Sequence, residues 1–259
     1  MGVLNVTPDS FSDGGDFLDP ARALERALAM EAEGATFIDV GGESTRPGAA
    51  EVTVDEELRR VLPVVESLAR SCRALVSVDT SRPEVIERVV GAGAVMINDV
   101  RALRHPGALP AVARSGAAAC LMHMRGEPAT MQQSVHYDDV VTEVRTFLAG
   151  RMADCEAQGI EAARVCVDPG FGFGKHTAHN LQLLRRLPEL LRLGRPVMVG
   201  LSRKSMLREL TGRAVHDRLA GSVALATAAV MKGASIVRAH DVAASCDAVR
   251  VAAALTDQE

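Results

Sequence analysis

Acidic and amide side chains recur at one kind of place in this sequence, the carboxyl end of a short apolar run. Four such positions are Asp39, Asp79, Asn98 and Asp168. A buried carboxylate is costly unless hydrogen-bond donors surround it, so this set predicts a donor-rich ligand, a metal, or structural pairing to loop amides. We favour ligand binding, because strand ends at the mouth of a barrel are where ligands are contacted. A flat heterocycle carrying amino and ring N–H groups would suit these acceptors.

A second set of side chains is basic and falls on the same predicted mouth. Its members are Arg46 in STRPG, Lys204 in SRKS, and Arg238 and His240 in RAH. An Arg fork and a helix amino terminus both hold phosphate oxygens, and loops after the last strands of barrels are frequent phosphate sites. The alternative is that these cations only balance the acidic set. We favour phosphate binding, because Arg238 and His240 follow the last predicted strand.

The glycine-rich segment DPGFGFGK, residues 168–175, does not match a nucleotide-binding loop. Pro169 and His176 stand where the G-x-x-x-x-G-K-[ST] pattern needs Gly and Ser or Thr. Its glycines instead permit a tight loop that presents Phe171 and Phe173, and each ring either covers an aromatic ligand or seals the barrel top. His123 is equally open, since it either lines the site or is a hydrogen-bonded barrel histidine.

Positioning these residues requires alternating strands and helices. Eight strand-like runs are Gly2 to Val6, Thr36 to Val40, Ala74 to Val78, Ala94 to Ile97, Ala117 to Met122, Arg164 to Val167, Pro196 to Gly200 and Ser235 to Val237. Amphipathic stretches such as Pro20 to Glu33 and Val54 to Leu68 lie between them. We predict an α/β fold, one (β/α)8 TIM barrel spanning residues 1–259 as a single domain. An open doubly wound sheet is the alternative, but polar segments follow all eight runs, which favours one shared mouth.

Composition narrows the class of partner. The net charge of −4 and pI near 6.0 give no general attraction to nucleic acid or anionic lipid, so the expected partners are small molecules. The five cysteines are odd in number and form no C-x-x-C pair, which predicts neither a disulfide framework nor a zinc site and fits a reducing cytoplasm. No apolar run approaches the roughly 20 residues of a membrane helix, so we expect no membrane association.

Eight segments, in order along the chain, resemble the signature segments of the dihydropteroate synthase family of pterin-binding enzymes. They are NVTPDSFSDGG, DVGGESTRPGA, VDT, NDV, MHMRGEPATMQ, DPGFGFGK, GLSRKS and VRAH. The resemblance implies a transferase reaction in which the amine of p-aminobenzoate displaces pyrophosphate from (7,8-dihydropterin-6-yl)methyl diphosphate. The product would be 7,8-dihydropteroate, and the implied cofactor is Mg²⁺.

The resemblance also assigns roles by motif. Residues expected to form the pterin pocket are Asp39, which lies beneath the site as a support, Asp79, Asn98, Asp168 and Lys204. Residues expected to bind the pyrophosphate are Asn5, Arg46, Arg238 and His240. Residues expected around the aminobenzoate are Thr45, Pro47, Phe173 and Ser205. Magnesium would be held by Asn5 and Asp13, and Asp9 and Asp13 would reach either this ion or the developing cation. The residues expected to be catalytic are Asp13, Lys204, Arg238 and His240.

Two alternatives remain open at this point. One is a corrinoid-linked pterin methyltransferase, which has no need for the PDSFSDGG, STRP and SRKS segments, and the other is a catalytically silent pterin-binding paralogue. The family resemblance implies a homodimer, paired through apolar helices around Val215 to Val230 and Val242 to Ala254. Sulfonamides, as p-aminobenzoate mimics, would bind the same subsite. We also expect Arg238→Ala to abolish turnover while the protein folds normally.

Overall fold

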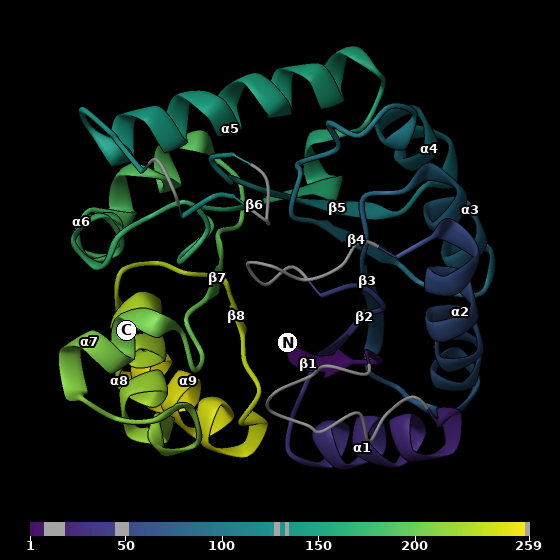
Figure 1. Ribbon diagram of the computed structural model, residues 1–259, viewed down its shortest axis with the longest axis horizontal. Coiled ribbons are helices and arrows are strands. Elements are labelled where there is room, and N and C mark those ends of the chain that lie inside the picture. The colour runs from purple at the N-terminus through teal and green to yellow at the C-terminus, as the bar shows by residue number, and fades with distance from the viewer. Residues whose placement is uncertain (8–18, 45–51, 127–129, 133–134, 257–259) are drawn as a thin grey trace.

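The structure is a computed structural model that describes residues 1–7, 19–44, 52–126, 130–132 and 135–256. Within these residues, parallel strands form an inner ring and helices surround it (Figure 1). The strands are β1 Gly2–Asn5, β2 Phe37–Gly41, β3 Leu75–Asp79, β4 Met96–Asp99, β5 Ala118–Met122, β6 Val165–Asp168, β7 Met198–Gly200 and β8 Ile236–Arg238. The helices are α1 Pro20–Ala32, α2 Val54–Ser71, α3 Pro83–Gly91, α4 Ala108–Ser115, α5 Val140–Ala157, α6 Thr177–Arg185, α7 Ser205–Thr211, α8 Leu219–Met231 and α9 Val242–Thr256.

The eight described strands pair in chain order. β1 to β6 form one parallel sheet, and β7 pairs with β8 in a second. Isolated parallel bridges join the two sheets at both seams, between Val167 and Val197 and between Gly2 and Ala239. The ring is therefore continuous, and the predicted (β/α)8 architecture is confirmed in preference to an open doubly wound sheet.

Each predicted strand is present with bounds moved by at most two residues. The common difference is at the carboxyl end, where the acidic residue belongs to the strand instead of following it. Asp79 and Asp168 are the last residues of β3 and β6 and pair with neighbours across the sheet. A polar side chain at a strand end keeps the extended backbone because the ladder hydrogen bonds use only main-chain groups.

Helix starts follow ordinary capping rules. Asp19 caps α1 by accepting from the Ala21 amide at 3.0 Å, and Pro20 occupies the first helical position. Thr53 caps α2 by accepting from the Glu56 amide at 3.2 Å. One predicted helix differs, because Val215–Asp217 forms a separate 3₁₀ turn before α8 begins.

Apolar side chains fill both sides of the strand ring. The buried residues of α1, α2 and α3 pack on the outside against Val and Ile of the strands. Inside the ring, Met96, Cys120, Cys166 and Met198 form a second cluster from four neighbouring strands. The interior is therefore a packed core, which leaves the carboxyl ends of the strands as the place for a site. No helix in the described ranges is long and apolar enough to cross a membrane.

Candidate active site

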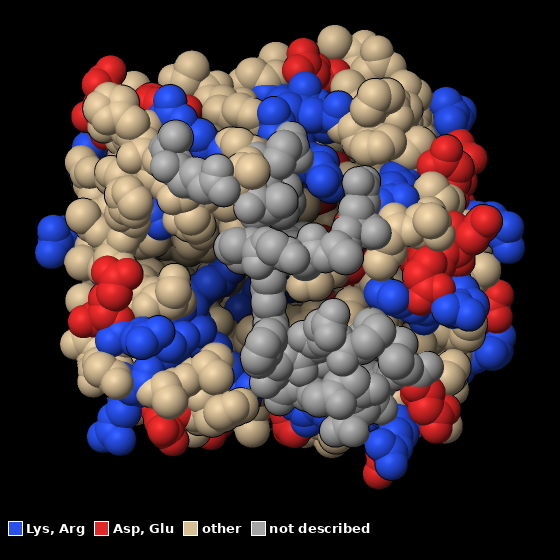
Figure 2. All heavy atoms as spheres, viewed as in Figure 1, with Lys and Arg blue, Asp and Glu red and all other residues tan. Residues whose placement is uncertain are grey.

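Several predicted ligand-binding residues end their strands at the same level of the ring. Asn5 pairs with Gly41, Gly41 with Asp79, and Asp79 with Asn98, so one row crosses the first four strands. Directly paired residues point to the same face of a sheet, which brings the side chains of Asn5, Asp79 and Asn98 together. The face in Figure 2 is hollowed near its centre, where Lys and Arg atoms lie over β7 and β8. The sequence prediction of one shared mouth is confirmed.

Arg238, at the end of β8, is the centre of a buried charge network. Its Nε donates to Asp39 Oδ2 at 2.7 Å, and a terminal guanidinium nitrogen donates to Asp79 Oδ2 at 3.3 Å. Asp39 is fully buried and also accepts from Ser77 Oγ at 2.5 Å and from Asn98 Nδ2 at 3.0 Å. Both Asp39 oxygens are thus occupied by protein donors, which fits the expectation that this residue lies beneath the pocket.

Two carboxyl groups of the mouth are hard to ionise. Burial raises the pKa of Asp79 to about 7, although the nearby Arg238 charge opposes that shift. Burial also raises the pKa of Asp168, whose Oδ1 accepts from the Gly170 amide at 2.6 Å. N–H donors of a ligand stabilise the ionised carboxylates. Such a ligand would bind by replacing the hydrogen bonds to water that these carboxylates lose on burial.

The ion pairs of Arg238 change one expectation. In this structure Arg238 balances the acidic set, which is the alternative that the sequence left open for the basic residues. Truncating it would leave Asp39 without its charge partner in a fully buried position. Removing one member of a buried ion pair is strongly destabilising, so the ion pairs revise that expectation: we now predict that Arg238→Ala lowers the stability of the fold as well as turnover.

Lys204 and Phe173 form the opposite wall of the mouth. The Lys204 ammonium lies 4.3 Å from the centroid of the Phe173 ring, a cation–π contact. Lys204 precedes α7, and Ser205, the first residue of that helix, is exposed. Phe171 is buried in the main core, whereas Phe173 is half-buried. The structure therefore separates the two rings: Phe171 seals the barrel and Phe173 borders the mouth.

His240 follows β8 and is neutral in this structure. Burial lowers its pKa to about 3, and the positive charges of Arg238, Arg203 and Lys204 act in the same direction. Its Nδ1 lies 3.1 Å from Ser202 Oγ, which fixes the ring. At neutral pH His240 therefore offers hydrogen bonds to a ligand and no positive charge of its own.

Sequence reasoning missed several residues that support the site. They are Ser77, a polar residue within an apolar strand, Ser202, and Lys175, which was considered only as part of a nucleotide-loop pattern. His123 is buried, and its Nδ1 contacts the Lys175 ammonium at 2.9 Å. The histidine thus fits the hydrogen-bonded barrel interpretation. A serine that interrupts the pattern LVSVD was the available signal for Ser77.

Predicted site residues on two loops lie outside the described residues. These are Asp9, Asp13, Thr45, Arg46 and Pro47. Their assigned roles stay predictions, as do the ligand roles of the residues that the structure places at the mouth.

The described residues of the mouth fit a magnesium ion that takes most of its ligands from a phosphate-bearing substrate and water. No group of three or more His, Cys, Asp or Glu in the described part of the chain is arranged to hold a metal ion. Mg²⁺ commonly takes one or two protein oxygen ligands and completes its shell with phosphate oxygens and water. The amide oxygen of Asn5 is a donor of the right kind, and its strand partner Gly41 has no side chain to crowd it.

Sequence comparisons place these features among known proteins. The profile of the family described as pterin binding enzyme matches residues 1–240. Over 251 residues the chain is 53% identical to the dihydropteroate synthase of Escherichia coli (strain K12), covering 97% of this chain and 89% of that one.

Structural comparisons agree. The Yersinia pestis dihydropteroate synthase in a sulfonamide drug complex superposes with a TM-score of 0.96 at 51% identity, covering 98% of this chain and 93% of that one. The dihydropteroate synthase from Xanthomonas albilineans in complex with 7,8-dihydropteroate gives a TM-score of 0.89 at 50% identity, covering 100% and 94%.

Proposed function

This chain belongs to the pterin-binding enzyme family, and we propose from that premise that it is a dihydropteroate synthase of folate biosynthesis. It condenses (7,8-dihydropterin-6-yl)methyl diphosphate with 4-aminobenzoate to give 7,8-dihydropteroate and diphosphate. The observation that carries the proposal is the single mouth in which the buried acceptors Asn98 and Asp168 and the half-buried Asp79 lie near the cations Lys204 and Arg238. A donor-rich pterin with an anionic leaving group needs both kinds of partner.

The pterin occupies the acidic part of the mouth. Its amino and ring N–H groups donate to Asp79 and Asp168, while Asn98 can donate and accept at the ring edge. Asp39 holds Asn98 and Arg238 in place from below, which is supported by its contacts to both. Lys204 donates to an acceptor atom of the ring system.

The diphosphate occupies the side of the mouth formed by β8 and β1. Arg238 retains donor groups beyond those it uses on Asp39 and Asp79, since a guanidinium carries five N–H bonds. His240 donates a hydrogen bond, and Asn5 and Asp13 are the residues that would hold a magnesium ion. When bound, Mg²⁺ would supply positive charge opposite the diphosphate. Asp13 and Arg46 lie outside the described residues, and their roles here come from the family resemblance.

The aminobenzoate ring lies against Phe173. Thr45 and Pro47, which lie outside the described residues, keep their predicted role at this subsite. Its carboxylate is received at Ser205, where the start of a helix favours an anion, and close to the Lys204 ammonium. Sulfonamides share the aryl amine and an acidic group para to it, so they bind the same subsite. Support comes from the Yersinia pestis relative, which was solved with a sulfonamide drug.

The reaction is a displacement that needs no protein nucleophile. The lone pair of the neutral aryl amine forms a bond to the methylene carbon at position 6 of the pterin while the carbon–oxygen bond to diphosphate breaks. The resulting ammonium proton is acidic and passes to solvent. Arg238 lowers the barrier by stabilising charge on the leaving group, and the rigid mouth orients the two substrates.

The test is diphosphate release from the purified protein with Mg²⁺, the pterin diphosphate and 4-aminobenzoate, omitting each in turn. Release that needs both organic substrates and yields dihydropteroate supports the synthase. Pterin binding without release would instead support a silent paralogue. Methyl transfer from a reduced folate to a corrinoid protein would support the methyltransferase alternative.

We further propose that the chain is a cytoplasmic homodimer. All five cysteines are free thiols, which fits a reducing compartment. α8 packs against α9, and both helices expose large apolar side chains, namely Leu219, Met231, Val251 and Leu255. Exposed apolar side chains on two helices that pack together support a subunit interface there.

A further inference from the structure

Lys175 is a buried amine that the proposed reaction does not use, and burial lowers its pKa to about 7. The side chain is only 3% exposed, although it follows the glycine-rich loop after β6. Its ammonium lies 2.9 Å from the Gly170 carbonyl oxygen, 3.0 Å from that of Phe173 and 3.3 Å from that of His123. Burying a charged or polar group costs free energy, so a buried lysine is expected where its hydrogen bonds stabilise a particular part of the structure.

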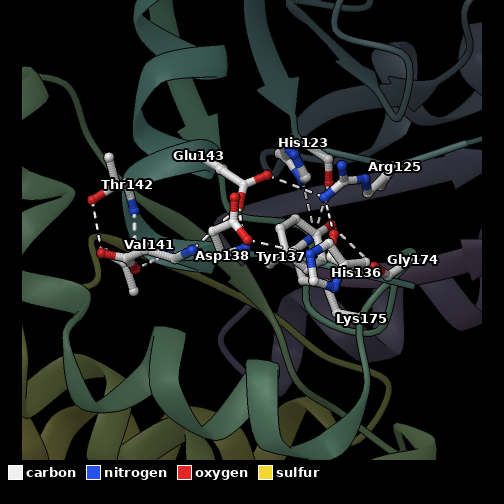
Figure 3. Close-up of polar contacts among 11 residues, drawn as sticks. His123, Arg125, His136, Tyr137, Asp138, Val141, Thr142, Glu143, Gly174 and Lys175 are labelled. Atoms are coloured by element: carbon white, nitrogen blue, oxygen red, sulfur yellow. Dashed lines mark hydrogen bonds and ion pairs between the residues drawn. The ribbon is translucent and has the colours of Figure 1, made fainter. Parts of the chain in front are cut away.

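His123 completes the shell around the Lys175 ammonium. Burial lowers the pKa of His123 to about 2, and the Lys175 charge acts in the same direction, so the ring is neutral. A neutral imidazole accepts at one nitrogen, and Nδ1 is the one that lies 2.9 Å from the ammonium (Figure 3). The Phe147 ring packs against the His123 ring in a T-shaped arrangement, at a centroid distance of 4.9 Å, and holds this orientation.

Carbonyl groups of the loop after β6 converge on the Lys175 side chain, so the loop requires a hydrogen-bond donor there. Gly170, Gly172 and Gly174 all have positive φ values, between 62° and 82°, which fold the main chain around the ammonium. Other side chains fasten the loop from outside, including Tyr137, whose hydroxyl donates to the Gly174 carbonyl at 3.0 Å (Figure 3). Lys175 contacts the carbonyl groups of Gly170 and Phe173 and so holds both ends of the turn that carries the Phe173 ring.

The choice of lysine fits this geometry. The sequence contains only three lysines, at positions 175, 204 and 232, among 29 Lys and Arg residues. An ammonium is a compact cation with three donors pointing in different directions, whereas the planar guanidinium directs its donors into one plane. Carbonyl oxygens that approach from several sides therefore suit Lys and not Arg.

The turn connects Lys175 to the reacting groups. The Gly170 amide donates to Asp168, and the Phe173 ring lies 4.3 Å from the Lys204 ammonium. We propose that Lys175 is a positioning residue for 4-aminobenzoate: it fixes the turn that sets the height of the Phe173 ring beneath Lys204. This inference rests on the proposed function, because it assigns Phe173 to the aminobenzoate wall.

The experiment compares Lys175→Met, Phe173→Ala and the double variant in the full chain, by diphosphate release with each substrate varied. Lys175→Met keeps an unbranched side chain of nearly the same length and removes its donors. We expect the KM for 4-aminobenzoate to rise about tenfold, with the KM for the pterin diphosphate nearly unchanged, because a small displacement of a positioning group costs this much. In the double variant the effects should not add, since Lys175 acts through Phe173.

Lys232→Met is the matched control, because Lys232 also donates to a backbone carbonyl, that of Arg185 at 3.3 Å, away from the mouth. It should leave both KM values unchanged. If Lys175→Met does not fold, as judged by circular dichroism, Lys175→Gln replaces it. The shorter glutamine side chain cannot donate to all of the carbonyl groups that Lys175 contacts, so it should raise the KM for 4-aminobenzoate by a smaller factor and again leave the KM for the pterin diphosphate nearly unchanged.

Additive effects in the double variant, or equal rises in both KM values, would overturn this inference. The proposed function would still stand if the wild-type protein turns over. Absence of turnover in the wild-type protein would overturn the proposed function and this inference with it.

Discussion

At the scale of single residues, the mouth combines groups whose charges depend on one another. Arg238 stabilises two carboxylates, and one of them, Asp79, remains close to half-protonated at neutral pH because burial raises its pKa to about 7. His240 loses its charge for the same reason, since burial and the neighbouring cations oppose protonation. The site thus carries less charge than its residue types suggest, and a charged substrate changes that balance.

Pterin affinity should therefore depend on the protonation of Asp79. Two ligand N–H groups need both carboxyl oxygens as acceptors, and only the ionised carboxyl offers both, so binding favours loss of its proton when the pH is below about 7. We expect affinity to fall as the pH decreases below that value, by up to about tenfold per unit. Calorimetry between pH 6 and 8 measures this. Asp79→Asn should bind weakly and without the pH dependence, and equal wild-type affinity at pH 6 and pH 8 would contradict the assignment.

Arg238→Ala should destabilise the fold as well as the site. The variant leaves the buried Asp39 without its charge partner, which we expect to lower the free energy of unfolding by roughly 3–5 kcal/mol. Urea unfolding measures the change. Arg250→Ala is the control, because the Arg250–Asp247 pair is exposed and such pairs contribute about 0–1 kcal/mol. A stability of Arg238→Ala equal to that of the control would show that Asp39 does not need the pair.

At the scale of elements, the loop after β6 is the most tightly determined part of the mouth. Three of its glycines have positive φ, and a Cβ on Gly170 would lie 1.9 Å from the His123 carbonyl oxygen. That closeness joins the β6 loop to the end of β5. The loop therefore acts as a rigid wall, and its sequence is constrained by backbone geometry in addition to ligand contacts.

Gly170→Ala should be more destabilising than Gly212→Ala. Both glycines have φ near +70°, so each substitution costs roughly 1–2 kcal/mol of backbone strain. Only Gly170 adds a steric conflict, because nothing lies within 4 Å of a Cβ on Gly212. Paired urea unfolding curves measure the difference. If the two variants lose equal stability, the close approach to His123 is relieved at no cost.

At the scale of the whole molecule, the ring of strands brings together residues that are far apart in the chain. Arg238 and Asp39 are 199 residues apart in sequence, and their contact spans the seam between β8 and the first strands. The helices near the carboxyl end gather on one side of the ring, where α7, α8 and α9 appear together in Figure 1. Their exposed apolar residues make this side the candidate subunit interface.

Introducing a charge on that side should separate the subunits. Val251 is 58% exposed on α9, and Val251→Glu would place a carboxylate in the proposed interface. We expect sedimentation of the wild-type protein as a dimer and of this variant as a monomer. Leu28→Glu is the control, since Leu28 is exposed on α1. A monomeric wild-type protein would exclude the homodimer.

The sequence alone determined the strands, most helices and the membership of the mouth. Apolar runs followed by polar segments are local patterns, and a ring of parallel strands brings their carboxyl ends together whatever the details of packing. Asp79, Asn98, Asp168, Lys204 and Arg238 were all predicted there, and all lie there. Several strands end one or two residues later than predicted. A polar residue can end a strand because the ladder hydrogen bonds use only main-chain groups.

Only the tertiary structure decided which of these groups pair and which remain for a ligand. Both oxygens of Asp39 accept hydrogen bonds from protein donors, and Arg238 pairs with two carboxylates. Phe171 is buried, whereas Phe173 borders the mouth. Lys175 donates to the carbonyl groups of the loop that it follows. Each of these outcomes depends on distances of a few ångströms between residues that are remote in sequence. Burial and hydrogen bonding set charge and position at that scale, and neither can be read from residue type and spacing.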